Sequence, residues 1–154
     1  MSGCAAKEEE DGVSQYIASP GSVPNITFEV RKVEQQPGEK LEEVILKKLQ
    51  KKIYLHPEVL LTNKDIRETN VGMRRSEKKQ GKLPQINIIL TGEGGDKLAK
   101  IAKAHMNKQI AILLDGKVVS CQWIKGQTIG VLVISNAFYT RGKSESVAKG
   151  LVGQ

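Results

Sequence analysis

The sequence predicts an α+β fold, with helices packed on one face of an antiparallel sheet. Three observations lead to this prediction. Strand and helix patterns alternate along the second half of the chain, and Asp115-Gly116 is a strong signal for a tight hairpin. The longest apolar runs, residues 110–114 and 131–134, are far shorter than the ~20 apolar residues of a membrane span. A polytopic transporter or channel is therefore excluded for this polypeptide by itself.

The first half of the chain begins with a segment of low hydrophobicity. Residues 1–24 contain a charged run and a Ser-Pro-Gly-Ser stretch, which predicts a disordered tail or a tether. A single domain is expected over residues 25–154. Within residues 1–6, small side chains surround Cys4, a pattern that resembles the end of a bacterial lipoprotein signal. Cys4 is therefore a candidate lipid anchor, and the alternative is an accidental cysteine in a disordered terminus.

Residues 26–30 alternate apolar and other side chains, which predicts a half-buried strand. The segment 41–49 has apolar residues at helical spacing, with glutamates early and lysines late, and this predicts a helix. Shorter elements follow: strands at 53–55 and 59–61, a capped turn of helix at 62–66, a strand at 71–74 and a polar loop at 76–82.

The second half is more regular. Residues 86–90 alternate and predict a strand, and Thr91 is positioned to cap a helix that presents Leu98, Ile101, Ala102 and His105 on one face and stops near Asn107. The remaining elements are a buried strand at 110–114, a type I′ turn at Asp115-Gly116, strands at 117–120 and 128–135, and a final helix beginning at Ser144 or Ser146.

The sequence offers little support for catalysis or for a bound cofactor. The two cysteines, Cys4 and Cys121, form no C-x-x-C motif, and the two histidines lack metal-ligand spacing, so no metal is expected. A Cys121–His105 pair is conceivable as a nucleophile and base, but a small packed or surface cysteine is the favoured interpretation. The glycine-rich segment 91–95 has Lys97 where a dinucleotide motif requires glycine.

The basic balance raises a different possibility. The chain has 24 Lys and Arg against 17 Asp and Glu, a formal net charge of +7, and part of the excess lies in Arg74–Lys82. One hypothesis is therefore a nucleic-acid or acidic-surface binding protein that uses this run. No aromatic residues interleave with these basic side chains, as stacking on single strands would require, so a flexible basic loop is the favoured interpretation and nucleic acid an unlikely partner.

Several segments together resemble the head subdomain of SecD, an accessory subunit of the bacterial preprotein translocase. The resemblance covers roughly residues 26–153. Its most specific part is the hairpin block, Ala111–Ser120, preceded by Glu93-Gly94-Gly95 and followed by residues 134–138. It implies a ferredoxin-like, SecD-head-like fold and an extracytoplasmic module, periplasmic or membrane-tethered, that holds unfolded polypeptide or an envelope partner. The membrane helices of SecD, and the proton-driven pulling attributed partly to them, are not carried over.

The sequence thus predicts a non-enzymatic module that binds protein or peptide and contacts the membrane only through a lipid anchor. Trp123, the only tryptophan, follows the hairpin and is a candidate partner contact if it is exposed, because tryptophan is enriched in interface hot spots. Burial beneath the second helix is the competing interpretation. A purely structural piece of a larger envelope assembly is a further alternative.

Overall fold

The computed structural model describes residues 14–46, 50–75, 82–124, 130–135 and 140–154. The chain folds into two compact units. Unit 1 contains residues up to 26, 66–90 and 131–154, and unit 2 contains residues 27–65 and 91–130. Both units combine an antiparallel sheet with helical structure, so the α+β class holds, but there are two sheets where a single one was predicted.

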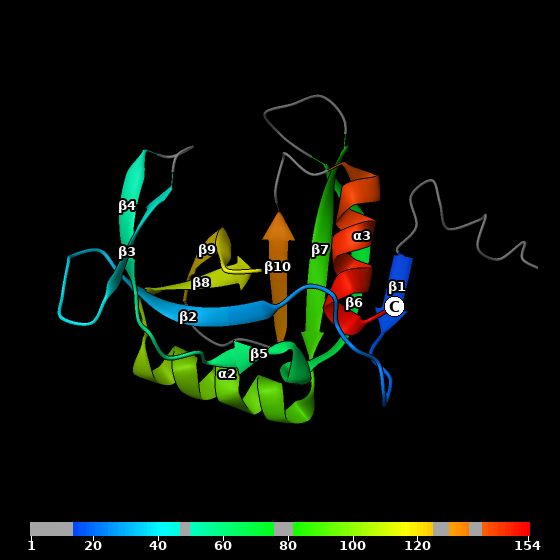
Figure 1. Cartoon of the computed structure of the whole chain (residues 1–154), viewed down its shortest axis with the longest axis horizontal. Helices are drawn as coiled ribbons and strands as arrows, with labels where there is room; N and C mark the ends of the chain where they lie inside the picture. The colour runs from blue at the N-terminus through cyan, green and yellow to red at the C-terminus, as the bar shows by residue number, and fades with distance from the viewer. Residues whose placement is uncertain (1–13, 47–49, 76–81, 125–129, 136–139) are drawn as a thin grey trace, which may run out of the picture. The chain divides into compact units, whose positions relative to one another are not determined.

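Unit 1 is a four-stranded sheet with one helix. Its strand order is β1-β6-β7-β10, and every pairing is antiparallel. The elements are β1 (Ser14–Ile17), β6 (Ile66–Arg75), β7 (Lys82–Leu90), β10 (Val131–Ser135) and α3 (Arg141–Val152). Helix α3 lies along β6 and β7 (Figure 1). Alternate residues of β7 are buried, because one face of the strand packs on the core and the other does not.

Unit 2 is built around a second sheet, with strand order β3-β4-β2-β8-β9. Its elements are β2 (Phe28–Glu34), β3 (Glu42–Leu46), β4 (Lys51–Leu55), β5 (Leu61–Thr62), the 3-10 turn η1 (Asn63–Asp65), α2 (Gly92–Ala104), β8 (Gln109–Leu114) and β9 (Lys117–Trp123). Figure 1 shows α2 beneath β2, β8 and β9, while β3 and β4 rise from the same sheet. Strand β8 is buried along its whole length, as its continuous apolar sequence predicts.

The turn between β8 and β9 has positive φ at both central residues, 50° at Asp115 and 82° at Gly116. This conformation matches the requirement of a type I′ hairpin. The turn is also fastened to the start of β2. The backbone N–H of Thr27 donates to Asp115 Oδ1 over 2.8 Å, and the N–H of Asp115 donates to the carbonyl of Thr27 over 2.9 Å.

The helix predicted at 41–49 is wrong in the described part of that segment. Residues 42–46 form strand β3, which pairs with β4 from Glu42 opposite Leu55 to Leu46 opposite Lys51. Val44 and Leu46 pack against the core, whereas Ile45 points away and is 56% exposed. Long-range pairing has overridden the local charge pattern. Residues 47–49 lie outside the described residues.

Other boundaries also differ from the prediction: the strand predicted at 71–74 is part of β6, which begins at Ile66, and the strand predicted at 117–120 extends to Trp123. The segment 1–24 was predicted as a disordered tail or tether, but within it Ser14–Ile17 form strand β1. These residues are ordered because they pair with Glu68–Val71 of β6. Helix α3 starts at Arg141 instead of Ser144 or Ser146, since Thr140 is the residue whose hydroxyl caps it. The strand predicted at 59–61 is confined to Leu61–Thr62. Residues 76–81 of the predicted loop at 76–82 lie outside the described residues. The same holds for residues 128–129 of the strand predicted at 128–135.

Candidate functional site

The candidate site lies where β2 and β8 meet the adjoining loops, beside one face of the unit 2 sheet, which we call the cluster face. Directly opposed residues of neighbouring strands share a face, so the pairs Val33–Leu55, Val44–Ile53 and Ala111–Cys121 place all of them together. Buried residues form a hydrophobic cluster here: Val33, Ile53, Leu55, Ala111 and Leu113. Partly buried side chains border it: Val44, Leu46, Val118 and Cys121.

Trp123 is on the same face, at the end of β9. It lies opposite Gln109 of β8, which in turn lies opposite Val33 of β2. The register therefore aligns these three side chains across three strands. Trp123 is 50% exposed, whereas Val33 is buried. Other large hydrophobic side chains are also exposed in the described residues, but Trp123 is the aromatic one among them and belongs to the face that carries the buried aliphatic cluster.

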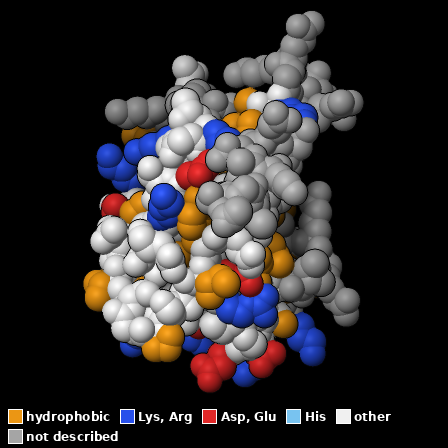
Figure 2. All heavy atoms as spheres, turned by 90° about the vertical axis from the view of Figure 1, so that its right-hand side faces the viewer, with side chains coloured by type: hydrophobic (Ala, Val, Ile, Leu, Met, Phe, Trp, Pro, Cys, Tyr) orange, Lys and Arg blue, Asp and Glu red, His pale blue; other side chains and the backbone are white. Residues whose placement is uncertain are grey.

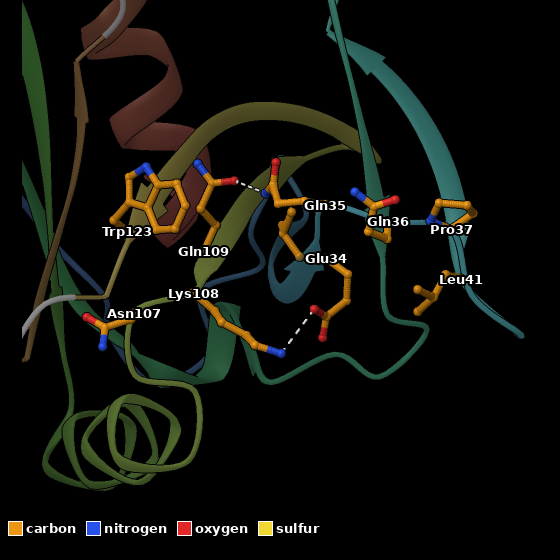
Figure 3. A pocket seen from close by; sticks show the side chains of 10 residues that line it. Glu34, Gln35, Gln36, Pro37, Leu41, Asn107, Lys108, Gln109 and Trp123 are labelled. Atoms are coloured by element: carbon orange, nitrogen blue, oxygen red, sulfur yellow. Dashed lines mark hydrogen bonds and ion pairs between the residues drawn. The ribbon is translucent and has the colours of Figure 1, made fainter.

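A groove opens beside Trp123, with a volume of about 470 Å³. Its lining comes from the end of β2 and the following loop, from Leu41, and from the turn that enters β8: Val33–Pro37, Leu41, Asn107–Gln109 and Trp123. In Figure 3 the Trp123 indole lies beside Gln109 at one end, and Pro37 and Leu41 lie at the other. Apolar surface therefore marks both ends of the groove.

Carboxamide groups contribute much of the lining of the groove. They belong to Gln35, Gln36, Asn107 and Gln109. The side chain of Gln35 donates through Nε2 to Oε1 of Gln109 over 2.6 Å, which fixes these two amides relative to one another (Figure 3). A carboxamide has the donor and acceptor of a peptide group, so such a lining is suited to hydrogen bonding with a polypeptide main chain.

The charges in the groove neutralise one another. Glu34 accepts from Lys108 Nζ at Oε1 over 3.2 Å and contacts His56 Nε2 through Oε2 at 3.0 Å. The pKa of Glu34 is lowered, first by the hydrogen bond with His56 and then by Lys108, against the opposing effect of burial. Glu34 is therefore ionised near neutral pH, and its charge is balanced locally although the whole chain carries +7.

The turn after α2 holds one wall of this groove. His105 caps α2, with its N–H bonded to the carbonyl of Ile101, and its own carbonyl accepts from the N–H of Lys108 over 3.2 Å. Asn107 has φ 64°, a left-handed conformation that asparagine tolerates better than most residues. Its N–H donates to the carbonyl of Ile124 over 3.0 Å, and the N–H of Ile124 donates to the carbonyl of Lys108 over 2.8 Å. Ile124, the residue after Trp123, is therefore hydrogen-bonded to the turn through both its N–H and its carbonyl.

The other residues singled out from the sequence have structural surroundings or lie outside the described residues. Asp115 and Gly116 form the β8–β9 turn, distant in the register from Trp123. Cys4 lies outside the described residues, as do residues 76–81 of the basic run Arg74–Lys82. On the face that Figure 2 shows, lysine and arginine side chains are scattered among acidic and hydrophobic ones.

The surroundings of Cys121 and His105 do not favour the ionised thiolate and imidazolium that a nucleophile–base pair would use. Burial raises the pKa of the Cys121 thiol and lowers the pKa of His105, so the thiolate and the imidazolium are both disfavoured. The glycine-rich segment serves the helix cap: Thr91 Oγ1 accepts from the N–H of Gly94 over 3.0 Å. Among the residues that the structure describes, no group of three or more His, Cys, Asp or Glu side chains is placed to hold a metal ion.

Sequence reasoning identified Trp123 but missed the rest of the groove. Glu34, Gln35, Lys108 and Gln109 carry no motif, and they meet only because β2 and β8 are paired. The one available signal was local: a run of glutamines followed by Pro37-Gly38 interrupts the chain after β2. Within the described ranges, no helix is long and apolar enough to cross a membrane.

Comparison with known proteins places this fold in a family. The family described as the P1 head subdomain of SecDF matches residues 39–151, which is more than half of the chain. A search of curated proteins gives no significant match. A crystal structure of SecDF in its super-membrane-facing form superposes with a TM-score of 0.60 at 21% identity, covering 84% of this chain and 19% of that chain.

A second SecDF structure, described as that of a membrane component that enhances protein export, gives a TM-score of 0.60 at 19% identity. It covers 84% of this chain and 63% of that chain, so this chain spans less than two thirds of either solved structure. At these identities the superpositions establish the fold alone. The family match confirms the resemblance seen in the sequence motifs, and the chain belongs to the family of SecDF P1 head subdomains.

Proposed function

We propose that the chain is a non-enzymatic extracytoplasmic module of protein export that holds a stretch of unfolded polypeptide in the Trp123 groove. The observation that carries the proposal is the exposed Trp123 at one end of a groove of about 470 Å³. One solved relative is described as enhancing protein export, which supports the same direction. A hot-spot tryptophan next to a pocket is the usual anchor of a protein interface.

The chemistry of the groove supports an uncharged, extended segment as the occupant. The lining has one carboxylate, on Glu34, and this group already contacts Lys108 and His56. A positively charged ligand therefore finds no free negative charge in the groove. Carboxamides can bond main-chain groups whatever the side chains are, which gives sequence-tolerant affinity. Trp123 at one end and Pro37 with Leu41 at the other would receive apolar side chains.

We further propose that Cys4 is a lipid anchor and that the segment between Cys4 and β1 tethers the module, with residues 25–154 acting together as its functional part. Support comes from the small residues around Cys4 and the charged segment that follows it. Such a tether would restrict the module to the membrane surface and raise its effective concentration there.

The proposal is tested with a synthetic peptide whose amino acids and termini have no titratable groups: an acetylated, amidated and rhodamine-labelled peptide of about twelve residues rich in Leu, Val, Ser and Thr. An extended peptide of this length spans about 40 Å at ~3.3 Å per residue, enough to cross the groove. Fluorescence polarisation should report saturable binding. Trp123→Ala should weaken it about tenfold or more, as expected for a hot spot worth ~1.4 kcal/mol or more.

The matched control is Ile45→Ala. Ile45 is as exposed as Trp123, at 56% against 50%, and belongs to the same sheet but does not line the groove. This variant should bind the peptide like the wild-type protein. Equal losses in the two variants, or no binding by the wild-type protein, would refute the proposal.

Salt separates this proposal from nucleic-acid binding through Arg74–Lys82, which none of the comparisons supports. Peptide affinity should change little as salt rises, because the groove charges are internally paired. Tight binding of a single-stranded oligonucleotide that weakens steeply with salt would instead favour a phosphate-binding surface.

A further inference from the structure

His105 is buried directly behind the turn that lines the groove. The residue is 6% exposed, and its Nε2 atom is buried with no hydrogen-bond partner. Buried polar atoms are nearly always paired, so an unpaired ring nitrogen is an exception that requires an explanation. A neutral imidazole tolerates this environment better than a charged one, because the charged ring would bring an extra N–H with no acceptor.

The backbone connects His105 to the groove on two sides. Its carbonyl accepts from Lys108, and Lys108 accepts from Ile124, the residue after Trp123. The ring also hydrogen-bonds the backbone of Val33, which lines the groove. A displacement of the His105 ring would therefore disturb both the turn at 105–108 and the support of Trp123.

The charged groups that face His105 come from three directions. Strand β2 contributes Lys32 and Glu34, the turn contributes Lys108, and His56 follows β4 with its ring edge-on to His105 at 6.4 Å between centroids. Of these only Glu34 is negative, and its two oxygens already contact Lys108 and His56. A proton on His105 would thus add a positive charge to a site whose one carboxylate is already engaged.

We propose that His105 makes the groove sensitive to acid: the groove holds polypeptide while the His105 ring is neutral, and protonation of this ring displaces it, loosens the 105–108 turn and releases the bound segment. This inference rests on the proposed function, since it concerns the regulation of the same groove. It requires two states of the turn, a closed state with His105 buried and an open state with the ring in water.

The direction of the effect follows from linkage. Burial lowers the pKa of His105 in the closed state below its ordinary value of 6.5, outweighing the attraction of Glu34. Above that ordinary value both states are neutral and the closed state keeps its full stability. As the pH falls below it, the open state binds a proton first, so the closed state loses stability until its own lowered pKa is reached. One linked proton can weaken peptide binding by at most about tenfold per pH unit in this window.

The test measures binding of the same labelled peptide between about pH 8 and pH 5, the range in which histidine titrates. Wild-type affinity should fall several-fold or more on acidification. His105→Gln cannot titrate but can still donate to the backbone of Val33, so its affinity should stay constant over this range. His105→Phe serves the same purpose should the glutamine variant fail to fold.

The chain contains only two histidines, which makes the matched control complete. His56→Gln keeps a hydrogen-bond donor for Glu34 and removes the other imidazole, and it should keep the pH dependence. The inference is overturned if wild-type affinity is constant across the range, if His105→Gln loses affinity as the wild-type protein does, or if the pH dependence disappears with His56 instead.

A readout without peptide separates this inference from the proposed function. Emission of Trp123, the only tryptophan, should change with pH in the free wild-type protein and stay constant in His105→Gln. Absence of peptide binding at high pH together with this change would refute the proposed function and retain the His105 switch. Peptide binding without any pH-dependent change in either readout would refute the switch and retain the proposed function.

Discussion

Substitution of Gly153 tests the close packing of the Val23 backbone against the C-terminal end of α3. Gly153 caps α3 in a left-handed conformation, with φ 78°. A Cβ atom at this position would lie 2.8 Å from the carbonyl carbon and oxygen of Val23 and 2.9 Å from its nitrogen. These are backbone atoms, so they cannot yield by a change of side-chain rotamer. Gly153→Ala therefore adds a steric clash to conformational strain.

The two contributions can be estimated separately. An L-residue in the left-handed region costs about 1–2 kcal/mol, and forcing an extra methyl group into a packed site costs about 1–3 kcal/mol. Their sum is about 2–5 kcal/mol of unfolding free energy, with about 3 kcal/mol as a central value. For a chain of this length each kcal/mol lowers Tm by about 2–4 °C, so Tm should fall by about 9 °C.

Gly21 provides the matched control. It also has positive φ, 88°, but a Cβ atom there would meet no other atom within 4 Å. Gly21→Ala should therefore show the strain alone, about 1–2 kcal/mol and a Tm lower by about 3–6 °C. Thermal unfolding followed by circular dichroism measures both. Equal losses in the two variants would show that the contact between Gly153 and Val23 contributes nothing.

Two further predictions concern the hairpin and the anchor. Gly116→Val should lower the unfolding free energy by about 1–2 kcal/mol, because valine is strained at φ 82°. Gly92 has equally open space around it and no positive φ, so Gly92→Ala should not destabilise the protein. An unchanged Tm for Gly116→Val would contradict this prediction. If Cys4 is the lipid anchor, mass spectrometry of the protein extracted from native membranes should find Cys4 acylated, and an unmodified Cys4 in the soluble fraction would exclude the anchor.

The elements predicted well from the sequence are those whose signals are local. The Thr91 cap fixes the start of α2, and its hydroxyl accepts from Gly94 as a capping residue should. The Asp115-Gly116 pair sets the pairing of Leu114 with Lys117 and of Leu113 with Val118, because a two-residue turn leaves little freedom there. Beyond these pairs the register shifts by one residue between Leu113 and Ile112, which the turn alone does not predict. The cap and the turn each depend on a few neighbouring residues, and sequence patterns report such features directly.

The segment 42–46 shows why other elements could not be predicted. Its charge order suits a helix dipole, but Val44 and Ile45 are β-branched residues that also suit a strand. The decision is made by β4, which pairs along the whole of β3 and places Val44 against Ile53 on the cluster face. Such a partner cannot be identified from the segment itself, since the burial that rewards the strand exists only after the sheet has formed.

The groove depends on long-range pairing more than any single element does. Glu34 and Lys108 are 74 residues apart, as are Gln35 and Gln109, and both pairs meet because β2 and β8 lie side by side. His56 reaches Glu34 through the β2–β4 pairing, so the two side chains that contact Glu34, His56 and Lys108, come from different parts of the sheet. Composition and motifs could therefore point to Trp123 alone, because tryptophan is conspicuous in isolation, whereas the chemical character of its neighbours is a property of the sheet register. A one-residue slip of β8 against β2 would move Gln109 to the other face, separate it from Gln35 and leave Trp123 without its groove.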